Sequence, residues 1–418
     1  MMKIMTSDKN EKTTYKIPIG PIHPALKEPI ELDLELDGEE VVDVDVKVTQ
    51  VHRSIEWLGM NRNNIIQTIY LAERICGICN ICHPLCLVMA VEQAAGITVP
   101  ERADYIRTIA AEMERIHSHL LWAGVAAHEI GFDTVFNITW RAREEIMDMI
   151  EFVFGNRVTK AIVQVGGVRR DITGEHLPRL QQGLDYYKGV FEHLRRAFLE
   201  DETVKLRCRN VGVLGQLDAL RLLAVGPVAR ASGVSKDVRQ DQAYAAYPDI
   251  GVKAVLPADI TGKTVGDVYD RIVVRLYEVA QSVDIIEKCI ARMPEGPLLA
   301  ETRMPRLLRQ LTDAEGEGLG RVEAPRGEDI HYVRLEKGMV PMATWHLRAP
   351  TYVNFVAVPT ILKGLQIADV PIAFASLDPC MSCTNRLTLT DRGSGRKSVI
   401  TYDEMHRLSL EKTRKLRG

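Results

Sequence analysis

Two cysteine pairs lie near opposite ends of the chain, and each has the Cys-x-x-Cys spacing that lets two thiolates converge on one metal ion. The first pair is Cys76 and Cys79, and the second pair is Cys380 and Cys383. Roughly 15–20 residues separate the pairs of a zinc ribbon, whereas most of this chain lies between them. A metal ion bound by both pairs would therefore lie in the middle of a large fold. Thiolates are soft ligands that suit nickel, iron and zinc.

The first pair also begins a longer run of cysteines with the spacing of a ferredoxin-type iron–sulfur cluster. This run consists of Cys76, Cys79, Cys82 and Cys86. Leu87 follows where such runs usually have proline, and a cluster on the run would leave the second pair unexplained. A structural zinc held by four thiolates and a set of ordinary buried thiols are two further interpretations of these cysteines.

The residues around the two pairs favour a different metal centre. Arg74-Ile-Cys-Gly-Ile-Cys-x-x-x-His near the start and Asp378-Pro-Cys-x-x-Cys-x-x-Arg near the end together resemble the motifs of nickel–iron hydrogenase large subunits. The second motif ends in Arg386 rather than His, which is similar to the energy-converting, membrane-associated branch that includes ferredoxin-linked and formate hydrogenlyase types. The resemblance covers nearly the whole chain and implies one hydrogenase large-subunit domain over residues 1–418.

The resemblance implies a nickel ion held by all four thiolates, with an iron that shares two of them and carries cyanide and carbon monoxide. By position in the motifs, Cys79 and Cys383 would bridge to iron, and Cys76 and Cys380 would be terminal on nickel. A terminal thiolate is the more basic and accessible sulfur, so Cys380 is the expected first proton acceptor.

The next proton carrier should be a carboxylate close to that sulfur. Gly20-Pro-Ile-His-Pro-Ala-Leu-Lys-Glu-Pro resembles the N-terminal segment of the family, and Glu28 stands where the proton-gate glutamate is expected. The alternative is a surface glutamate beside a loop proline. His23 of the same segment could belong to the path. Glu73 could be a second carrier, or it could pair with Arg74.

Other residues are expected around the metals. Glu-Ala-Pro325-Arg326-Gly resembles the segment that places a guanidinium over the metals, a suitable group because it is always charged and cannot ligate. Asp378 would orient Arg326. Pro325 and Thr351 would contact the diatomic ligands. His83 would donate to a bridging sulfur, or it is a histidine of the core.

Arg53-Ser-Ile-Glu56 resembles an Arg-x-x-Glu element of the family. In related enzymes the glutamate lies near a magnesium or iron ion that a C-terminal histidine completes, and Arg386 occupies that histidine position here. A cationic side chain cannot ligate a metal. We therefore expect no such ion at Glu56, and we expect Glu56 to pair with Arg386 or Arg53.

A second hypothesis follows from kinship with the quinone-site subunit of respiratory complex I. The segments that resemble that subunit are Gly20-Pro-Ile-His-Pro, Val51-His-Arg-Ser-Ile-Glu and 226–239. That subunit needs neither cysteine pair, so this hypothesis describes a quinone-pocket protein without nickel. A zinc-stabilised scaffold without redox activity is a third hypothesis.

Hydrophobic periodicity predicts a mainly α fold with a small antiparallel β-sheet in residues 16–50, where apolar and acidic residues alternate around Asp37-Gly38. Three- and four-residue spacing of apolar residues predicts helices. These helices are expected at 101–123, 137–154, 176–200, 265–293 and 357–367. The basic tail, 387–418, is either a solvated extension or a segment that a maturation endopeptidase removes after Arg386.

Composition and the lengths of apolar runs bear on the partners and the location that we expect for the protein. The chain has 418 residues with 46% apolar residues, 26% charged residues and a net charge of −3, so nothing favours nucleic acid as a partner. No apolar run approaches the ~20 residues of a membrane span. With no leader sequence recognised, we expect a cytoplasmic protein, held at the inner face of the cell membrane by partner subunits.

The resemblance also implies how electrons reach and leave the site. The expected reaction is the interconversion of hydrogen with protons and electrons. We expect no iron–sulfur cluster in this chain, so a small subunit with a 4Fe–4S cluster should carry electrons to and from ferredoxin. Membrane subunits would couple the reaction to ion movement.

Overall fold

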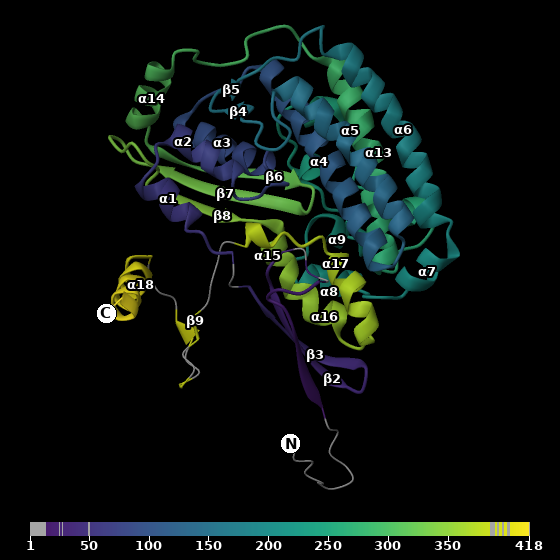
Figure 1. Cartoon of the computed structure of the whole chain (residues 1–418). Coiled ribbons are helices and arrows are strands. Elements are labelled where there is room, and N and C mark those ends of the chain that lie inside the picture. The colour runs from purple at the N-terminus through teal and green to yellow at the C-terminus, as the bar shows by residue number, and fades with distance from the viewer. Residues whose placement is uncertain are drawn as a thin grey trace.

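The computed structural model describes residues 14–24, 26, 28–48, 51–384, 389–390, 393–394, 397–398 and 402–417. The predicted N-terminal hairpin is confirmed. β2 (Glu31–Asp37) and β3 (Glu40–Lys47) pair antiparallel around the turn at Gly38, and β1 (Tyr15–Ile19) adds a third strand beside β2. Alternation places Leu32, Leu34 and Leu36 on the buried face. The sheet lies at one end of the molecule next to α16 (Figure 1).

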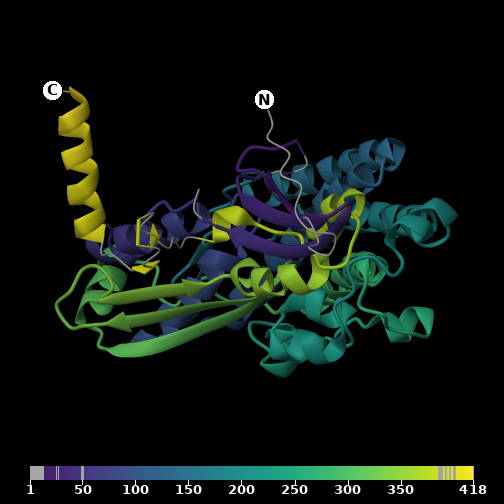
Figure 2. The ribbon, with the colours of Figure 1, turned by 90° about the horizontal axis from the view of Figure 1, so that it is seen from below.

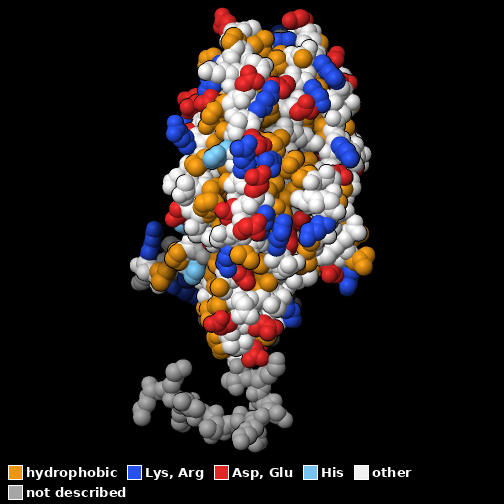
Figure 3. All heavy atoms as spheres, turned by 90° about the vertical axis from the view of Figure 1, so that its right-hand side faces the viewer, with side chains coloured by type: hydrophobic (Ala, Val, Ile, Leu, Met, Phe, Trp, Pro, Cys, Tyr) orange, Lys and Arg blue, Asp and Glu red, His pale blue; other side chains and the backbone are white. Residues whose placement is uncertain are grey.

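Four long helices run side by side and form the body of the molecule (Figure 1). They are α4 (Glu101–Glu129), α5 (Asp133–Phe154), α6 (Leu177–Leu199) and α13 (Val268–Arg292). The helices predicted at 101–123, 137–154, 176–200 and 265–293 are therefore confirmed. The central helix α4 is buried nearly all round, and most of its charged residues are buried, in ion pairs such as Arg107 with Glu92. On the outer face around α6, acidic and basic side chains are interspersed with apolar ones (Figure 3).

A second three-stranded sheet was not expected from the sequence. β6 (Gly316–Ala324), β7 (Gly327–Leu335) and β8 (Thr344–Arg348) form an antiparallel meander that packs against α3 (Cys82–Ala95). Glycines in β6 allow this close contact, because a Cβ on Gly318 or Gly320 would lie 1.9 Å from a carbonyl oxygen of α3. Alternating glycine is unfavourable for a strand, so no strand was predicted there.

Shorter elements connect these layers. On the N-terminal side they are α1 (Ile55–Asn61), α2 (Ile65–Glu73), β4 (Val163–Gln164), β5 (Gly167–Val168), α7 (Glu202–Cys208), α8 (Gln216–Arg221), α9 (Gly226–Ala231), α10 (Val238–Asp241), α11 (Tyr247–Ile250), α12 (Pro257–Thr261) and α14 (Met304–Asp313). On the C-terminal side they are α15 (Pro350–Asn354), η1 (Phe355–Ala357), α16 (Val358–Leu362), η2 (Ile367–Asp369), α17 (Val370–Ala375), η3 (Met381–Cys383), β9 (Leu389–Thr390), β10 (Lys397–Ser398) and α18 (Tyr402–Arg417).

The prediction of one helix over 357–367 was wrong. The structure has the short helix α16 and the 3-10 turn η2 there, separated by Gly364 with a φ of 83°. In the basic tail, α18 stands apart from the rest of the ribbon in two perpendicular views (Figures 1 and 2). Within the described ranges, no helix combines the length and the apolarity needed to cross a bilayer.

Candidate metal centre

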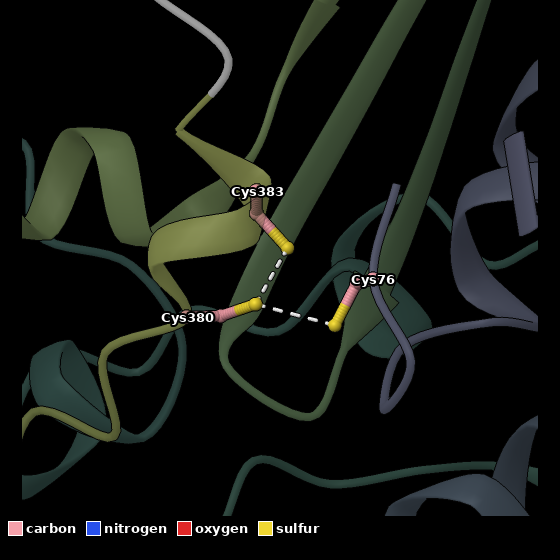
Figure 4. Close-up of side chains that lie close together, drawn as sticks. All are labelled: Cys76, Cys380 and Cys383. Carbon is pink, nitrogen blue, oxygen red and sulfur yellow. Dashed lines mark hydrogen bonds between the residues drawn. The ribbon is translucent and has the colours of Figure 1, made fainter. Parts of the chain in front are cut away.

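The two cysteine pairs meet at one buried site. The first pair lies in the loop between α2 and α3, and the second pair lies at η3 after α17. Cys76 Sγ lies 3.2 Å from Cys380 Sγ, and Cys380 Sγ lies 2.9 Å from Cys383 Sγ. These three thiols point toward one another (Figure 4). The backbone N–H of Cys79 lies 3.2 Å from Cys76 Sγ, and all four side chains are at most 3% exposed.

The thiols act on one another electrostatically. The pKa of Cys76 is lowered well below the usual thiol range, because the thiols of Cys380 and Cys383 donate hydrogen bonds to its sulfur. The pKa of Cys383 is raised, because Cys380 and Cys76 hold its proton in the shared network. Of the four pKa values only that of Cys76 is lowered, so the network favours a thiolate at this sulfur, and four soft donors fit a transition metal. The donor set is therefore suited to a nickel–iron centre.

The cysteine run does not form its own cluster in the described structure. Cys82 and Cys86 lie inside α3, and Cys86 Sγ donates to the backbone oxygen of Asp329 at 3.3 Å. Among the described residues, the cysteine group that could hold a metal takes Cys76 together with the second pair. The geometry thus joins the two pairs and leaves the rest of the run as buried thiols.

Arg326 lies against the sulfur of Cys79. Its Nε and Nη2 donate to the backbone oxygen and Oδ1 of Asp378, both at 2.8 Å, and its Nη1 lies 3.2 Å from Cys79 Sγ. Ser118 on α4 accepts a further bond from Nη1 at 3.3 Å. Burial alone would lower the pKa of Arg326, but Asp378 and Cys79 raise it well above its usual range. The guanidinium is therefore held as a cation in a fixed orientation.

Glu28 reaches the second pair from the loop between β1 and β2. Its Oε2 accepts the backbone N–H of Met381 at 2.6 Å, and its Oε1 accepts the hydroxyl of Ser382. The carboxylate thus contacts the two residues that follow Cys380. Thr351 Oγ1 accepts the backbone N–H of Cys380 at 3.1 Å. Pro325, the residue before Arg326, is buried in the turn between β6 and β7.

A cavity of about 390 Å³ leads from this carboxylate and guanidinium along α4 and α5. Its lining is mostly apolar and includes Leu121, Trp122, Phe136, Trp140 and Phe374. Glu28, Arg326 and Asp378 line the same cavity. A small apolar molecule could occupy such a space beside the segments that carry the two cysteine pairs.

Family models match two parts of the chain. The model described as "Respiratory-chain NADH dehydrogenase, 49 Kd subunit" matches residues 129–386, and the model described as "Nickel-dependent hydrogenase" matches residues 53–123. The "Membrane-bound hydrogenase subunit alpha" of Pyrococcus furiosus is 46% identical over 403 residues, which are 96% of this chain and 94% of that protein. The chain belongs to the family of membrane-bound hydrogenase large subunits and their complex I relatives.

Other members of this hydrogenase and complex I family match at lower identity. "Formate hydrogenlyase subunit 5" of Escherichia coli (strain K12) is 35% identical, over 97% of this chain and 69% of that protein. A subunit of the NADH-quinone oxidoreductase of Dehalococcoides mccartyi is 34% identical, over 89% of this chain and 98% of that protein. Among solved structures, a chain of the membrane-bound sulfane sulfur reductase, an archaeal respiratory membrane complex, matches with a TM-score of 0.83 and 30% identity, covering 91% of this chain and all of that one.

Arg53, at the start of the hydrogenase-matched segment, has a role that sequence reasoning missed. Its Nη1 donates to the backbone oxygen of Arg74 at 2.8 Å, and its Nη2 donates to those of Ile75 at 2.7 Å and Ser382 at 2.8 Å. It thereby ties the segment before the first pair to the interior of the second pair. Bonds to carbonyl oxygens leave no signature in the side chains of the partners, so only the Arg-x-x-Glu motif marked this residue.

Glu56 contacts β8. Its Oε1 accepts the backbone N–H of Leu347 at 2.9 Å and lies 3.7 Å from His346 Nδ1. Arg386 lies outside the described residues, so its predicted pairing with Glu56 stays a prediction. Glu73 is buried, accepts the backbone N–H of Ala161 at 2.6 Å and pairs with Arg74 at 2.8 Å.

Burial raises the pKa of Glu73. The pairing with Arg74 matches one of its two predicted roles, and proton transfer stays a prediction. His23 is exposed on the loop that carries Glu28, where it lines a smaller cavity of about 210 Å³ with Leu26 and Phe374.

His83 lies behind the second pair of this hydrogenase-like site. Its Nε2 lies 3.3 Å from Cys383 Sγ, and its Nδ1 lies 2.8 Å from Asp329 Oδ2. Asp329 and His331 are buried on β7, a strand that the sequence did not predict, so neither residue was expected here. Asp329 and His331 are two residues apart, so on a strand both side chains would lie on one face. This spacing was the one sequence signal that could have grouped them.

Proposed function

We propose that this chain is the catalytic subunit of an energy-converting nickel–iron hydrogenase, which interconverts hydrogen with protons and electrons. The observation that carries the proposal is the meeting of both cysteine pairs at one buried site. In this proposal all four thiolates would hold the centre, Cys76 and Cys380 as ligands of nickel alone and Cys79 and Cys383 as ligands shared with an iron that would carry cyanide and carbon monoxide. The nickel–iron centre supplies the heterolytic cleavage of hydrogen when it is bound.

The chain itself supplies the proton route. Cys380 Sγ is the first acceptor, because a terminal thiolate keeps an accessible lone pair. Glu28 takes the proton next, and its contacts with Met381 and Ser382 hold the carboxylate beside the loop that carries this sulfur. The path then continues along the Glu28 loop, where exposed His23 leads toward solvent. Glu73 is a second candidate carrier on the side of the first pair.

Arg326 supplies a fixed positive charge and hydrogen-bond donors above the sulfurs. Such preorganised donors act strongly in a buried site, because no water has to reorganise during reaction. Asp378 fixes the guanidinium through two bonds and keeps it from turning into the cavity. The apolar cavity beside it would admit hydrogen and exclude bulk water. Pro325 and Thr351 would border the diatomic ligands.

The names of the relatives support an assembly with partners. They include a "Membrane-bound hydrogenase subunit alpha" and a "Carbon monoxide-induced hydrogenase". We propose that a small subunit with a 4Fe–4S cluster exchanges electrons with ferredoxin carriers, that membrane subunits move ions, and that this chain sits on the cytoplasmic face. In the same proposal residues 1–418 form one domain, and a maturation endopeptidase removes 387–418.

A quinone-pocket subunit without nickel is the second candidate, because three relatives at 33–35% identity are named as subunits of NADH-quinone oxidoreductase. The two functions differ in what the cysteine pairs do. Only the hydrogenase needs all four thiolates as ligands. Metal content therefore separates them, and zinc alone would indicate the scaffold hypothesis.

The test uses the complex purified without oxygen. We expect stoichiometric nickel, iron in excess of the partner clusters, infrared bands of bound carbon monoxide and cyanide, and hydrogen evolution from reduced ferredoxin. Cys380→Ser should lose nickel and activity. Cys208→Ser is the matched control, because Cys208 is a buried thiol on α7, away from both pairs. A wild-type complex with intact subunits but without nickel would contradict the proposal.

A further inference from the structure

The segment 226–239, which the sequence marked by its resemblance to a complex I subunit, lies against the turn that carries Arg326. Ala324 of β6 pairs with Gly327 of β7, so the turn between them consists of only Pro325 and Arg326. Because a two-residue turn follows its two strands closely, the backbone that leads into it determines where Arg326 begins. Whatever holds the end of β6 therefore also decides where the guanidinium can reach.

The closest contact between the segment and the turn is made by two glycines. A Cβ on Gly226 would lie 2.4 Å from the backbone oxygen of Arg326, and a Cβ on Gly327 would lie 2.6 Å from the backbone nitrogen of Gly226. Both distances are too short for any side chain. The two glycines also have positive φ angles, 66° and 124° respectively. α9 therefore begins directly against the backbone of the turn and limits its movement on that side.

Glu323, the residue before the last one of β6, is held through all of its polar groups. Its backbone N–H donates to Tyr244 Oη at 3.1 Å, and its backbone oxygen accepts from Arg115 Nη2 at 2.6 Å. Its Oε1 accepts from Arg230 Nη1 at 2.8 Å, and its Oε2 accepts the backbone N–H of Val238 at 3.0 Å. The residue is 1% exposed. Partners from α4, α9, α10 and the loop after α10 thus fix the entrance of the turn.

Arg230 connects Glu323 to the rest of the buried network. Its Nη1 also donates to the backbone oxygen of Lys236 at 2.9 Å, and its Nε donates to Glu278 Oε1 at 2.8 Å. Burial raises the pKa of Glu323, while the charge of Arg230 and the N–H of Val238 oppose this shift. Both carboxylate oxygens of Glu323 face donors, so a glutamine here would have to direct its amide donor at one of them.

We propose that Glu323 and Arg230 are positioning residues that hold the turn so that the Arg326 guanidinium reaches Asp378 and the sulfur of Cys79. Both act through Arg326, whose donors are effective only if they are in place before the reaction begins. The inference rests on the proposed function, because it takes Arg326 to act beside a nickel–iron centre.

The first test is Glu323→Gln in the complex purified without oxygen. We expect unchanged nickel content, infrared cyanide bands shifted in the same direction as in Arg326→Lys, and hydrogen evolution lowered by about 10²-fold, as for a displaced catalytic group. Glu92→Gln is the matched control. Glu92 is also a buried carboxylate that accepts from an arginine, Arg107, and from a backbone N–H, that of Gly166, but these partners lie away from the turn. The control should leave the bands in place.

A double-mutant cycle shows whether Glu323 acts through Arg326. Two residues that act through one another have non-additive effects on a rate. With Arg326→Lys already present, Glu323→Gln should lower hydrogen evolution by less than about twofold, because no guanidinium is left to position. An equal factor in both backgrounds would show that Glu323 supports the fold in general, which would overturn the positioning role.

A second variant displaces the turn without changing any charge. Gly226→Ala places a methyl group against the backbone oxygen of Arg326 and should reproduce the shift of the cyanide bands. Gly96→Ala is its control, because Gly96 has a φ of 63° and a Cβ there would have no neighbour within 4 Å. If Glu323→Gln fails to assemble, the comparison of these two glycine variants decides.

The outcomes separate the inference from the proposed function. Wild-type bands and rates in Glu323→Gln and Gly226→Ala would overturn the positioning role and leave the hydrogenase assignment intact. Absence of the bands from the wild-type complex would overturn the assignment, and the inference with it. Amide hydrogen exchange in complex from nickel-depleted cells gives a readout without the metals. Exchange across 324–327 should be faster in Glu323→Gln than in wild type, and equal exchange would overturn the positioning role.

Discussion

Arg53 Nη2 donates to the backbone oxygen of Ser382 at 2.8 Å, while the same guanidinium binds the carbonyl groups of Arg74 and Ile75. This one side chain therefore connects the two segments whose cysteines must meet. Because the cysteine pairs come from opposite ends of the chain, no local element can fix their distance. A planar group with several donors in fixed directions is suited to that task.

Arg53→Lys should loosen this connection. An ammonium group cannot reproduce three donors at the guanidinium spacing, and each lost bond to a charged group costs about 1.5–3 kcal/mol. We expect a lower nickel content per chain and a lower melting temperature, measured by elemental analysis and calorimetry of the purified complex. Arg62→Lys at the end of α1 is the control, because Arg62 is exposed as Arg53 is, but its guanidinium lies over the ring of Trp57. Full nickel occupancy in Arg53→Lys would show that the connection does not support metal retention.

Arg326→Lys should keep the metals and lose most activity. The substitution retains the positive charge but not the paired bonds to Asp378 or the donor at Cys79. Loss of one preorganised donor lowers turnover by about 10²–10³-fold in comparable sites. Hydrogen evolution and nickel content should be measured on the same preparation. Arg348→Lys, on β8 and paired with Glu328, is the control; equal losses in both variants would point to a structural effect.

How far the sequence predicts this site depends on the kind of contact. The long helices follow from their apolar spacing, and the cysteine pairs follow from motifs whose side chains carry the chemistry. Ion pairs buried inside α4 were not predictable, because Glu112 and Arg115 have the residue types of a solvated face. They are buried only because partners from other elements, such as Arg239, neutralise them.

The contact between His83 and Asp329 behind Cys383 was hidden for a different reason. It depends on β7 lying beside α3, and that packing depends on glycines of β6 that weaken any strand prediction. His83 alone was recognisable from its motif. Its partner Asp329 became visible only once the second sheet was in place. The contacts of Arg53 with carbonyl oxygens also leave no signal in the sequence, because every residue has a backbone oxygen.

Glu28→Gln should separate metal binding from proton transfer. A glutamine can still accept the backbone N–H of Met381, so the loop and the metal centre should persist. It cannot take up a proton at neutral pH. We expect most hydrogen–deuterium exchange to be lost, measured by mass spectrometry of the evolved gas, with nickel content unchanged. Glu31→Gln is the control, because Glu31 pairs with Lys47 on the N-terminal sheet. Wild-type exchange in Glu28→Gln would remove this residue from the route.

Glu112 should make the stability of the fold depend on pH. Burial alone would raise the pKa of this carboxyl, but Arg115 and Arg239 lower it to about 2, against 4.5 for the unperturbed group. A depressed folded-state pKa stabilises the protein above the unfolded-state value, and this contribution is lost as pH falls from 4.5 toward 2. The shift corresponds to about 3 kcal/mol at neutral pH.

Glu112→Gln removes this pH-dependent contribution. We expect the difference in unfolding free energy between wild type and variant to be largest at neutral pH and to shrink below pH 4.5, measured by urea unfolding with tryptophan fluorescence. Glu192→Gln is the control, because Glu192 binds Arg195 and Arg196 on the solvent side of α6, where water and salt screen the pairs. If the difference in unfolding free energy between wild type and Glu112→Gln stays constant from neutral pH to pH 3, the two arginines do not stabilise the ionised carboxyl. The hydrogen bonds that Glu112 accepts from Tyr247 and Ser282 would then be what compensates its burial.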